Sequence, residues 1–475
     1  MYYYCFSIIC DFSINFINIK KIRLFDIVLM SVCVVIILDA VAPTASIGLS
    51  SAFWWIFLLI LFFYPYGLVT AELGTTYTDE GGIYDWVKRA FGNKWGARVA
   101  WYYWINYAFW MASTGVLFAM FIEQLTGRGL SPLWISIISL VVIWGCVWIC
   151  MFKASENIWI LNIGAICKAF VLVAIGLIGL YIALTKGVAN DFSVHNFIPN
   201  FNDGMRFLPM IIFNFMGFEI IATVSGDMKN PGKEIPKALI MGGILIAFFY
   251  LLSTFGILVA VPVSKLSPST GILESFYVML GHGSLATYFI CFIGIVFMFT
   301  LIANLVSWGG GVNYVSMYAA KNNDLPKIFA AKYKNTDMTL GAGIMNGIVA
   351  SILILVYYVL AMNGMSGDIF WNLFSLSSIT LLMSYILLFP SFSALRKIDP
   401  DADRPFKVKG GKIKIFLISY VPMILLILSL ILFFYVPGVP FDYSYFYQVG
   451  SGLIITIVVN ELIIRYLHRK NPLKI

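Results

Sequence analysis

The sequence predicts an all-α membrane protein with twelve transmembrane helices. Three observations lead to this class: the composition, twelve long apolar stretches, and the way positive charge is divided between the segments that join them. Of the 475 residues, 61% are apolar and only 11% are charged, whereas about 25% of the residues in soluble domains are charged. A soluble fold of this size would lack the polar side chains needed to cover its surface.

Twelve stretches are long enough to cross a bilayer, which takes about 20 residues of apolar helix. A cytoplasmic segment of residues 1–24 precedes them, a cytoplasmic loop of residues 395–412 separates the tenth from the eleventh, and residues 468–475 form a cytoplasmic tail. The positive charges of the N-terminal segment follow its apolar run, so it does not have the order of a cleaved signal peptide. The stretches are residues 25–49, 53–74, 98–125, 131–152, 157–185, 206–226, 236–262, 284–320, 340–362, 369–394, 413–436 and 445–467.

The distribution of Lys and Arg predicts the orientation of these helices. If both termini are cytoplasmic, the inside segments hold 26 of the 31 basic residues and the outside loops hold 4, while Lys168 lies within a span. Cytoplasmic loops of membrane proteins carry an excess of Lys and Arg. The sequence therefore predicts a multi-pass protein of the cytoplasmic (inner) membrane in contact with membrane lipid, and its net charge of +8 requires no nucleic acid partner.

Three spans contain residues that interrupt an apolar helix. In the first, Asp39 precedes the stretch VAPTASIG at residues 41–48, and we expect the helix to break there; the alternative is a proline kink with Asp39 bonded to a neighbouring helix. In the sixth, Asn214, Gly217 and Glu219 lie at membrane depth, where Glu219 either marks a functional site or bridges helices. In the eighth, we expect the three glycines at 309–311 to break the helix.

The matched breaks in the first and sixth spans indicate a secondary transporter. Such breaks are typical of proteins built from two inverted repeats that bind a substrate between corresponding broken helices, and here the repeats would cover about residues 25–185 and 206–394. Half-helix N-termini offer unpaired N–H groups to a substrate carboxylate. A channel is the alternative, and it would not need two opposed breaks around a closed site.

Lys168 is the basic residue that lies deepest in a predicted span, with no charged residue within ten positions. A low-dielectric environment disfavours the charged form of an amine, so a lysine there is able to exchange a proton. We interpret Lys168 as a coupling residue for protons, with a static tether between helices as the alternative. In that alternative, Glu219 or Asp39 would be the coupling or gating residue.

Other features point to packing rather than chemistry. The aromatic stretch 101–110 is interpreted as an interfacial belt and helix packing, from which Tyr107 or Trp110 could reach a pocket. The seven cysteines and three histidines show no metal-type spacing. The intramembrane ionisable groups supply no catalytic set, so we expect neither an enzyme nor a cofactor or metal, and no segment resembles a nucleotide-binding loop.

Three segments resemble bacterial amino acid permeases of the amino acid–polyamine–organocation superfamily. They are FNFMGFEIIATVSGDMKNPGKEIPKALI (213–240), AELGTTYTDEGGIYDWVKRAFG (71–92) and AAKNNDLPKIFA (319–330), in the family's order and spacing. The resemblance covers about residues 25–470. It implies a LeuT-like fold of five-plus-five inverted repeats with two extra C-terminal helices, and transport of amino acids or related amines by alternating access, either proton-coupled or by exchange.

The resemblance also implies roles for particular residues. Backbone N–H groups of the broken first helix would bind the substrate carboxylate, and they map to Thr44, Ala45, Ser46, Ile47 and Gly48. The sixth-helix break would receive the amine, an aromatic lid would lie over it, and an aromatic residue of the eighth helix would line the pocket; these map to Phe213, Met216, Gly217 and Trp308. Lys168 would occupy the place of a sodium ion, and Glu219 would contribute to gating or the pH response.

The chain departs from the family in the first helix. The family's Gly-Ser-Gly-like motif is replaced here by Thr-Ala-Ser-Ile-Gly at residues 44–48. Backbone approach is less open at Ala45 and Ser46 than at glycine. This stretch is more similar to glutamate/γ-aminobutyrate-type antiporters.

Overall fold

The computed structural model describes residues 22–38, 41–79, 81–152, 154–199, 201–223, 225, 228–266, 271–332, 339–363 and 369–470. Asp39, which was expected to couple or gate transport, lies outside these residues, as do most of the N-terminal segment and the end of the tail. The elements are α2 (Leu24–Val35), α3 (Val41–Ala45), α4 (Ser50–Leu58), η2 (Leu59–Phe63), α5 (Tyr64–Thr76), α6 (Gly82–Phe91), α7 (Asn93–Thr126), α8 (Pro132–Ile149), α9 (Ala154–Lys186), α10 (Val194–Phe197), α11 (Phe201–Phe213), α12 (Ile220–Thr223), α13 (Pro231–Ala260), η4 (Val263–Lys265), α14 (Ile272–Leu280), α15 (Ser284–Lys321), η5 (Lys327–Ala330), α16 (Leu340–Met362), α17 (Ile369–Tyr385), α18 (Leu388–Ile398), α19 (Lys412–Leu432) and α20 (Tyr443–Lys470).

Ten helical spans among the described residues are long and apolar enough to cross a membrane. The two pairs of shorter helices, α2–α3 and α11–α12, occupy the first and sixth predicted spans. Together they account for the twelve stretches predicted from the sequence. The chain is a multi-pass membrane protein, and the fold class predicted from the sequence is confirmed.

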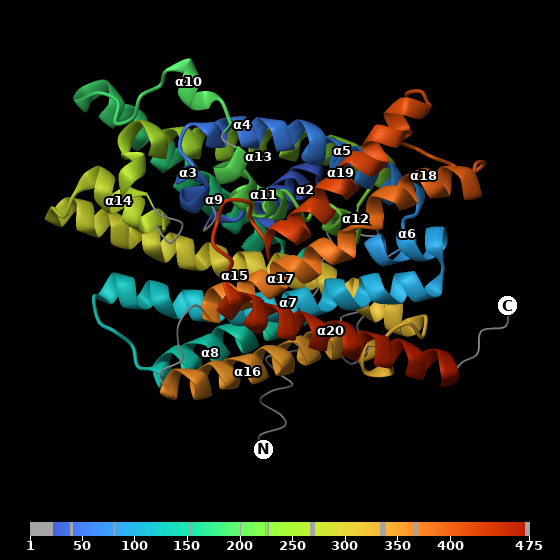
Figure 1. Cartoon of the computed structure of the whole chain (residues 1–475). Coiled ribbons are helices and arrows are strands. Elements are labelled where there is room, and N and C mark those ends of the chain that lie inside the picture. The colour runs from blue at the N-terminus through green and yellow to red at the C-terminus, as the bar shows by residue number, and fades with distance from the viewer. Residues whose placement is uncertain are drawn as a thin grey trace.

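The long helices lie side by side and run between two ends of the molecule (Figure 1). α10 and α14 lie at one end, at the left of the view, and α6 and the α18–α19 connection lie at the other. The sequence prediction, which rests on the distribution of Lys and Arg, is that the second end faces the cytoplasm. The long helix α7 runs through the middle of the bundle and packs against α17, α15, α8 and α16.

The position of α7 explains the aromatic stretch at 101–110. All ten of its residues are buried, and Trp104 is 2% exposed. The interfacial-belt part of our interpretation is therefore wrong, because this part of α7 is covered by other helices and not by lipid headgroups. The aromatic side chains face neighbouring helices within the bundle.

The break in the first span begins earlier than expected. α2 ends at Val35, the backbone is extended at Ile36, and Val41–Ala45 is helical. Pro43 does not break this helix, because the first turn of a helix tolerates a residue without an N–H. The stretch VAPTASIG is thus not the site of the break, which starts at Ile36.

The sixth and eighth spans show opposite outcomes. The sixth is broken as predicted, with α11 ending at Phe213 and α12 beginning at Ile220. The eighth is not broken, since α15 is continuous from Ser284 to Lys321. Its glycines allow close packing instead: a Cβ on Gly309 would come within 2.4 Å of the Tyr107 hydroxyl.

The second span contains an irregularity that we did not predict. The helix widens into a π-helical turn at η2 before α5 begins. Pro65 follows this turn and lacks the N–H that an α-helix would use there, which accounts for the wider turn.

Candidate functional site

The C-terminal end of α2 is held by side chains from three other helices. The last carbonyl groups of a helix have no partner within it, and here those of residues 33–36 all accept hydrogen bonds from side chains. Lys168 of α9 takes two of them, Trp308 of α15 takes one, and Tyr250 of α13 takes one. The helix end at the break in the first span is therefore stabilised by tertiary hydrogen bonds and is not frayed.

Lys168 lies directly against this helix end and is 1% exposed. Its Nζ donates to the Cys33 carbonyl, to the Ile36 carbonyl at 2.5 Å and to Asn304 Oδ1 at 2.9 Å. A lysine ammonium has three donors, and these three acceptors match them. A positive charge at the C-terminal end of a helix is also stabilised by the helix dipole. The structure thus places Lys168 at the first-span break.

The break in the sixth span is organised by two tyrosines. The Tyr66 hydroxyl of α5 donates to the Glu219 carboxyl group and accepts from the N–H groups of Gly217 at 3.1 Å and Glu219 at 3.3 Å. The Tyr103 hydroxyl of α7 donates to Glu219 Oε1 at 2.5 Å. Glu219 is 1% exposed, so these donors satisfy a carboxyl group that would otherwise be buried without partners.

Gly217 brings the two breaks close together. Its φ of +118° is strained for any residue with a side chain, and a Cβ there would meet Val34 of α2 at 2.5 Å and Trp308 at 2.9 Å. The Trp308 indole N–H donates to the Val34 carbonyl at 3.0 Å. Trp308 and Gly217, both predicted to be near the pocket, therefore meet at the first-span break.

The other residues that were predicted to form the site in the sixth span, Phe213 and Met216, lie at the start of the break or within it. Phe213, expected to be a lid, is 3% exposed and packs edge-on against Phe374 of α17, with ring centroids 5.3 Å apart. Trp110 of α7 packs edge-on against Trp308 at 5.9 Å. Met216 is completely buried. An aromatic layer thus connects α7, α11, α15 and α17 around the two breaks.

The stretch of residues 44–48 lies elsewhere. Its last three N–H groups already donate to backbone carbonyls: Ser46 to Ala42 at 3.2 Å, and Ile47 and Gly48 to residues 44 and 45. Gly48 packs beside Val263, beyond the end of α13. The structure places this stretch at the far end of α3 and not at the unwound residues 36–38.

Sequence reasoning missed Tyr66, Tyr250 and Asn304. Each lies in an apolar helix; the two tyrosines have a residue type expected of ordinary packing, whereas Asn304 is a polar residue at membrane depth and carries the same signal as Asn214. The three-dimensional contacts distinguish all three, because each bonds to a group that the sequence did single out or to the backbone beside it.

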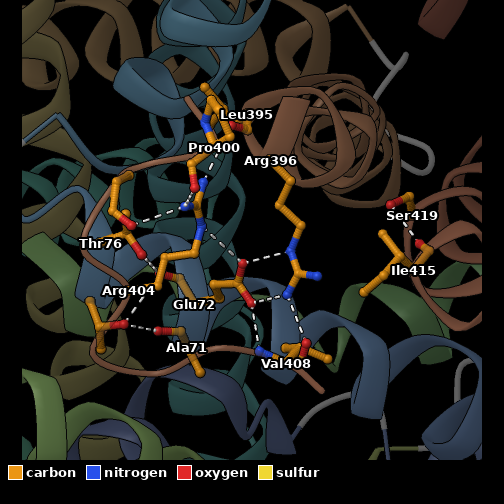
Figure 2. A network of polar contacts seen from close by, with 12 residues as sticks. Ala71, Glu72, Thr76, Leu395, Arg396, Pro400, Arg404, Val408, Ile415 and Ser419 are labelled. Atoms are coloured by element: carbon orange, nitrogen blue, oxygen red, sulfur yellow. Dashed lines mark hydrogen bonds and ion pairs between the residues drawn. The ribbon is translucent and has the colours of Figure 1, made fainter. Parts of the chain in front are cut away.

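A second polar network, drawn in Figure 2, joins α5 to α18 and to the loop that follows α18. Glu72 of α5 is 1% exposed, and its carboxylate accepts from both Nε and Nη2 of Arg396 and from the Val408 N–H at 2.7 Å. Arg404 Nε lies 3.5 Å from Glu72 Oε1. This carboxylate ties the loop between α18 and α19 to α5.

A third polar contact joins α6 to the end of α15. Asp324 accepts from Lys88 Nζ at 2.7 Å and from the Tyr84 hydroxyl at 2.6 Å. Burial raises the pKa of Tyr84 well above its ordinary value, and the neighbouring Asp324 raises it further. The hydroxyl therefore keeps its proton and remains a donor to Asp324.

Two spanning helices that break at membrane depth, at positions contacted by side chains of other helices, are typical of α-helical membrane transporters. The sequence matches the model of the amino acid permease family over residues 22–462, and the chain belongs to this family, within the amino acid–polyamine–organocation superfamily. The family implies the LeuT-like fold that we expected.

Individual relatives extend this result. The chain is 45% identical over 454 residues to the probable agmatine/putrescine antiporter AguD of Lactococcus lactis subsp. lactis, covering 94% of this chain and 95% of that protein. It is 23% identical to the glutamate/gamma-aminobutyrate antiporter of the same organism, over 94% of this chain and 90% of that protein. It is 26% identical to polyamine transporter PUT1 of Oryza sativa subsp. japonica, over 73% of this chain and 61% of that protein.

Proposed function

We propose that this protein exchanges small aliphatic amines, of the agmatine and putrescine type, across the cytoplasmic membrane by alternating access, with both termini inside. The observation that carries the proposal is the 45% identity to an agmatine/putrescine antiporter over nearly the full length of both chains. The substrate would bind between the two breaks, near Gly217, Trp308 and Phe213.

Two features of the first span support an amine over an amino acid. The N–H groups of residues 46–48 are engaged by backbone carbonyls, which leaves them unable to receive a carboxylate. The sequence also carries Asp39 between Leu38 and Val41, and a carboxylate there would pair with an ammonium or guanidinium group. A substrate without a carboxyl group suits both features.

The sharpest test compares substrates that differ only by the carboxyl group. Proteoliposomes are loaded with agmatine, and uptake of labelled putrescine is measured with external competitors. Agmatine should compete well while arginine, its α-carboxylated counterpart, should compete about 100-fold more weakly, because the N–H groups of residues 46–48 are already bonded to backbone carbonyls. Ornithine should fail against putrescine in the same way. Equal competition by arginine and agmatine would refute an amine site, and uptake that does not saturate would indicate a channel.

Lys168 supports a second candidate, proton-coupled uptake. A neutral amine has one donor fewer than an ammonium, so loss of the proton would weaken the hold of Lys168 on its acceptors, two of which are carbonyls at the end of α2. The helix end would then loosen. In this reading Lys168 is the coupling residue that the sequence predicted, and Glu219, held by Tyr66 and Tyr103, is a gating residue.

A further inference from the structure

The hydroxyl group of Tyr250 lies between the two broken helices. It accepts from the Ile37 N–H at 3.0 Å, and it lies 3.3 Å from the Val35 carbonyl and 3.3 Å from the Asn214 carbonyl. Val35 and Ile37 flank the end of α2, and Asn214 is the first residue after α11. One side chain from a third helix, α13, therefore contacts the backbone of both breaks.

The ring of Tyr250 is fixed by its neighbours. Trp55 of α4 stacks on it with ring centroids 4.4 Å apart and an interplanar angle of 17°. Phe215, which follows Asn214, packs edge-on against it at 6.2 Å. Tyr250 is completely buried. Because the ring has little freedom, the hydroxyl oxygen has a defined position relative to both breaks.

The hydroxyl has one proton and two acceptors at equal distance. A tyrosine O–H donates one hydrogen bond and accepts others, so its acceptor bond from Ile37 is compatible with either donation. Donation to Asn214 joins the two breaks, whereas donation to Val35 directs the hydroxyl proton to α2. The same group can therefore hold the breaks together or release the sixth-span break without losing its own partner.

We propose that Tyr250 is a positioning residue that sets the spacing between the two breaks and makes them move together. The link to transport rests on the proposed function, in which the substrate binds between these breaks. Tyr250 does not need to touch the substrate. It keeps the two breaks in the arrangement that binds substrate, and this lowers the entropic cost of ordering them when the substrate binds.

The first test does not depend on transport and compares two tyrosine-to-phenylalanine variants. Tyr250→Phe retains the stacked ring and removes the hydroxyl. Tyr107→Phe is the matched control, because the Tyr107 hydroxyl is also buried and donates to a backbone carbonyl of another helix, Leu305, without joining the breaks. Hydrogen–deuterium exchange is measured on peptides covering residues 33–38 and 213–220.

Amide exchange in both peptides should be about tenfold faster in Tyr250→Phe than in wild type, since amide protection reports local opening. The control should leave both peptides unchanged. If the peptide at residues 213–220 keeps its wild-type protection in Tyr250→Phe, the hydroxyl does not link the breaks and the proposal is wrong.

The second test measures the binding of agmatine and the effect of agmatine on the melting temperature. Tyr250→Phe should weaken agmatine binding about tenfold and reduce the rise in melting temperature that agmatine causes, while Tyr107→Phe should bind normally even if it is less stable. Normal binding by Tyr250→Phe would overturn the positioning role. Failure of the wild-type protein to transport amines would instead refute the proposed substrate class. The hydrogen–deuterium exchange of the two peptides would still decide the role of Tyr250.

Discussion

Replacing Glu72 by glutamine should destabilise the protein strongly. The substitution removes the negative charge from a buried carboxylate that accepts from Arg396 and the Val408 N–H and lies 3.5 Å from Arg404. The Arg404 side chain is 5% exposed and that of Arg396 is 18% exposed, so water can replace little of what is lost. Removing one partner of a buried ion pair costs about 3–5 kcal/mol.

A matched control is available at the other arginine–glutamate pair. Glu461 accepts from Arg98 Nε at 2.6 Å and Nη2 at 3.0 Å, with side chains 31% and 25% exposed. The geometry is similar and water reaches the pair, so Glu461→Gln should cost about 1 kcal/mol or less. The two variants therefore separate burial from hydrogen-bond geometry.

The assay is the melting temperature of the detergent-purified protein, followed by loss of the monodisperse peak. At roughly 1 °C per kcal/mol for a chain of this length, Glu72→Gln should melt about 3–5 °C below wild type and Glu461→Gln within about 1 °C of it. Similar melting temperatures for Glu72→Gln and wild type would show that the buried network does not hold the α18–α19 loop to α5.

Three further predictions concern the site and the orientation. Phe213→Ala should lower amine exchange, because the sequence predicts that this side chain occludes the site, and loss of its contact with Phe374 should also lower stability; normal exchange at equal expression would contradict the lid role. Gly217→Ala should abolish binding, since its Cβ would meet Val34 at 2.5 Å at a backbone φ that favours glycine; wild-type affinity in a radioligand assay would be the opposing result. In a cysteine-free background, a cysteine at His195 should be labelled by impermeant reagents only from outside, and one at Lys407 only from inside. The reverse pattern would overturn the orientation.

The span number and the sixth-span break were predictable because they depend on composition along the chain. Apolar length identifies a spanning helix, and a carboxyl group beside glycine at membrane depth identifies a break. The same reasoning failed at residues 309–311, where Gly309 packs closely against Tyr107 and Gly311 against Ile220, and α15 stays continuous. Glycine signals both a break and a close contact, and sequence alone does not separate the two.

The first-span break shows a second limit. Pro43 suggested a break at 41–48, but proline is compatible with the first turn of a helix, and the helix end at Val35 is held by Lys168, Trp308 and Tyr250. Those side chains come from helices distant in the sequence. The position of the break is therefore a property of tertiary contacts, which no local pattern reports.

Exchange without a pH gradient tests the central claim most directly. Proteoliposomes are loaded with labelled putrescine at equal internal and external pH, and efflux is followed with and without external agmatine. An exchanger predicts rapid efflux only when agmatine is present, and no accumulation by empty vesicles under an imposed pH gradient. Accumulation of putrescine by empty vesicles under a pH gradient would contradict exchange. If this accumulation is lost in Lys168→Arg, because arginine cannot release its proton, the uptake is proton-coupled through Lys168.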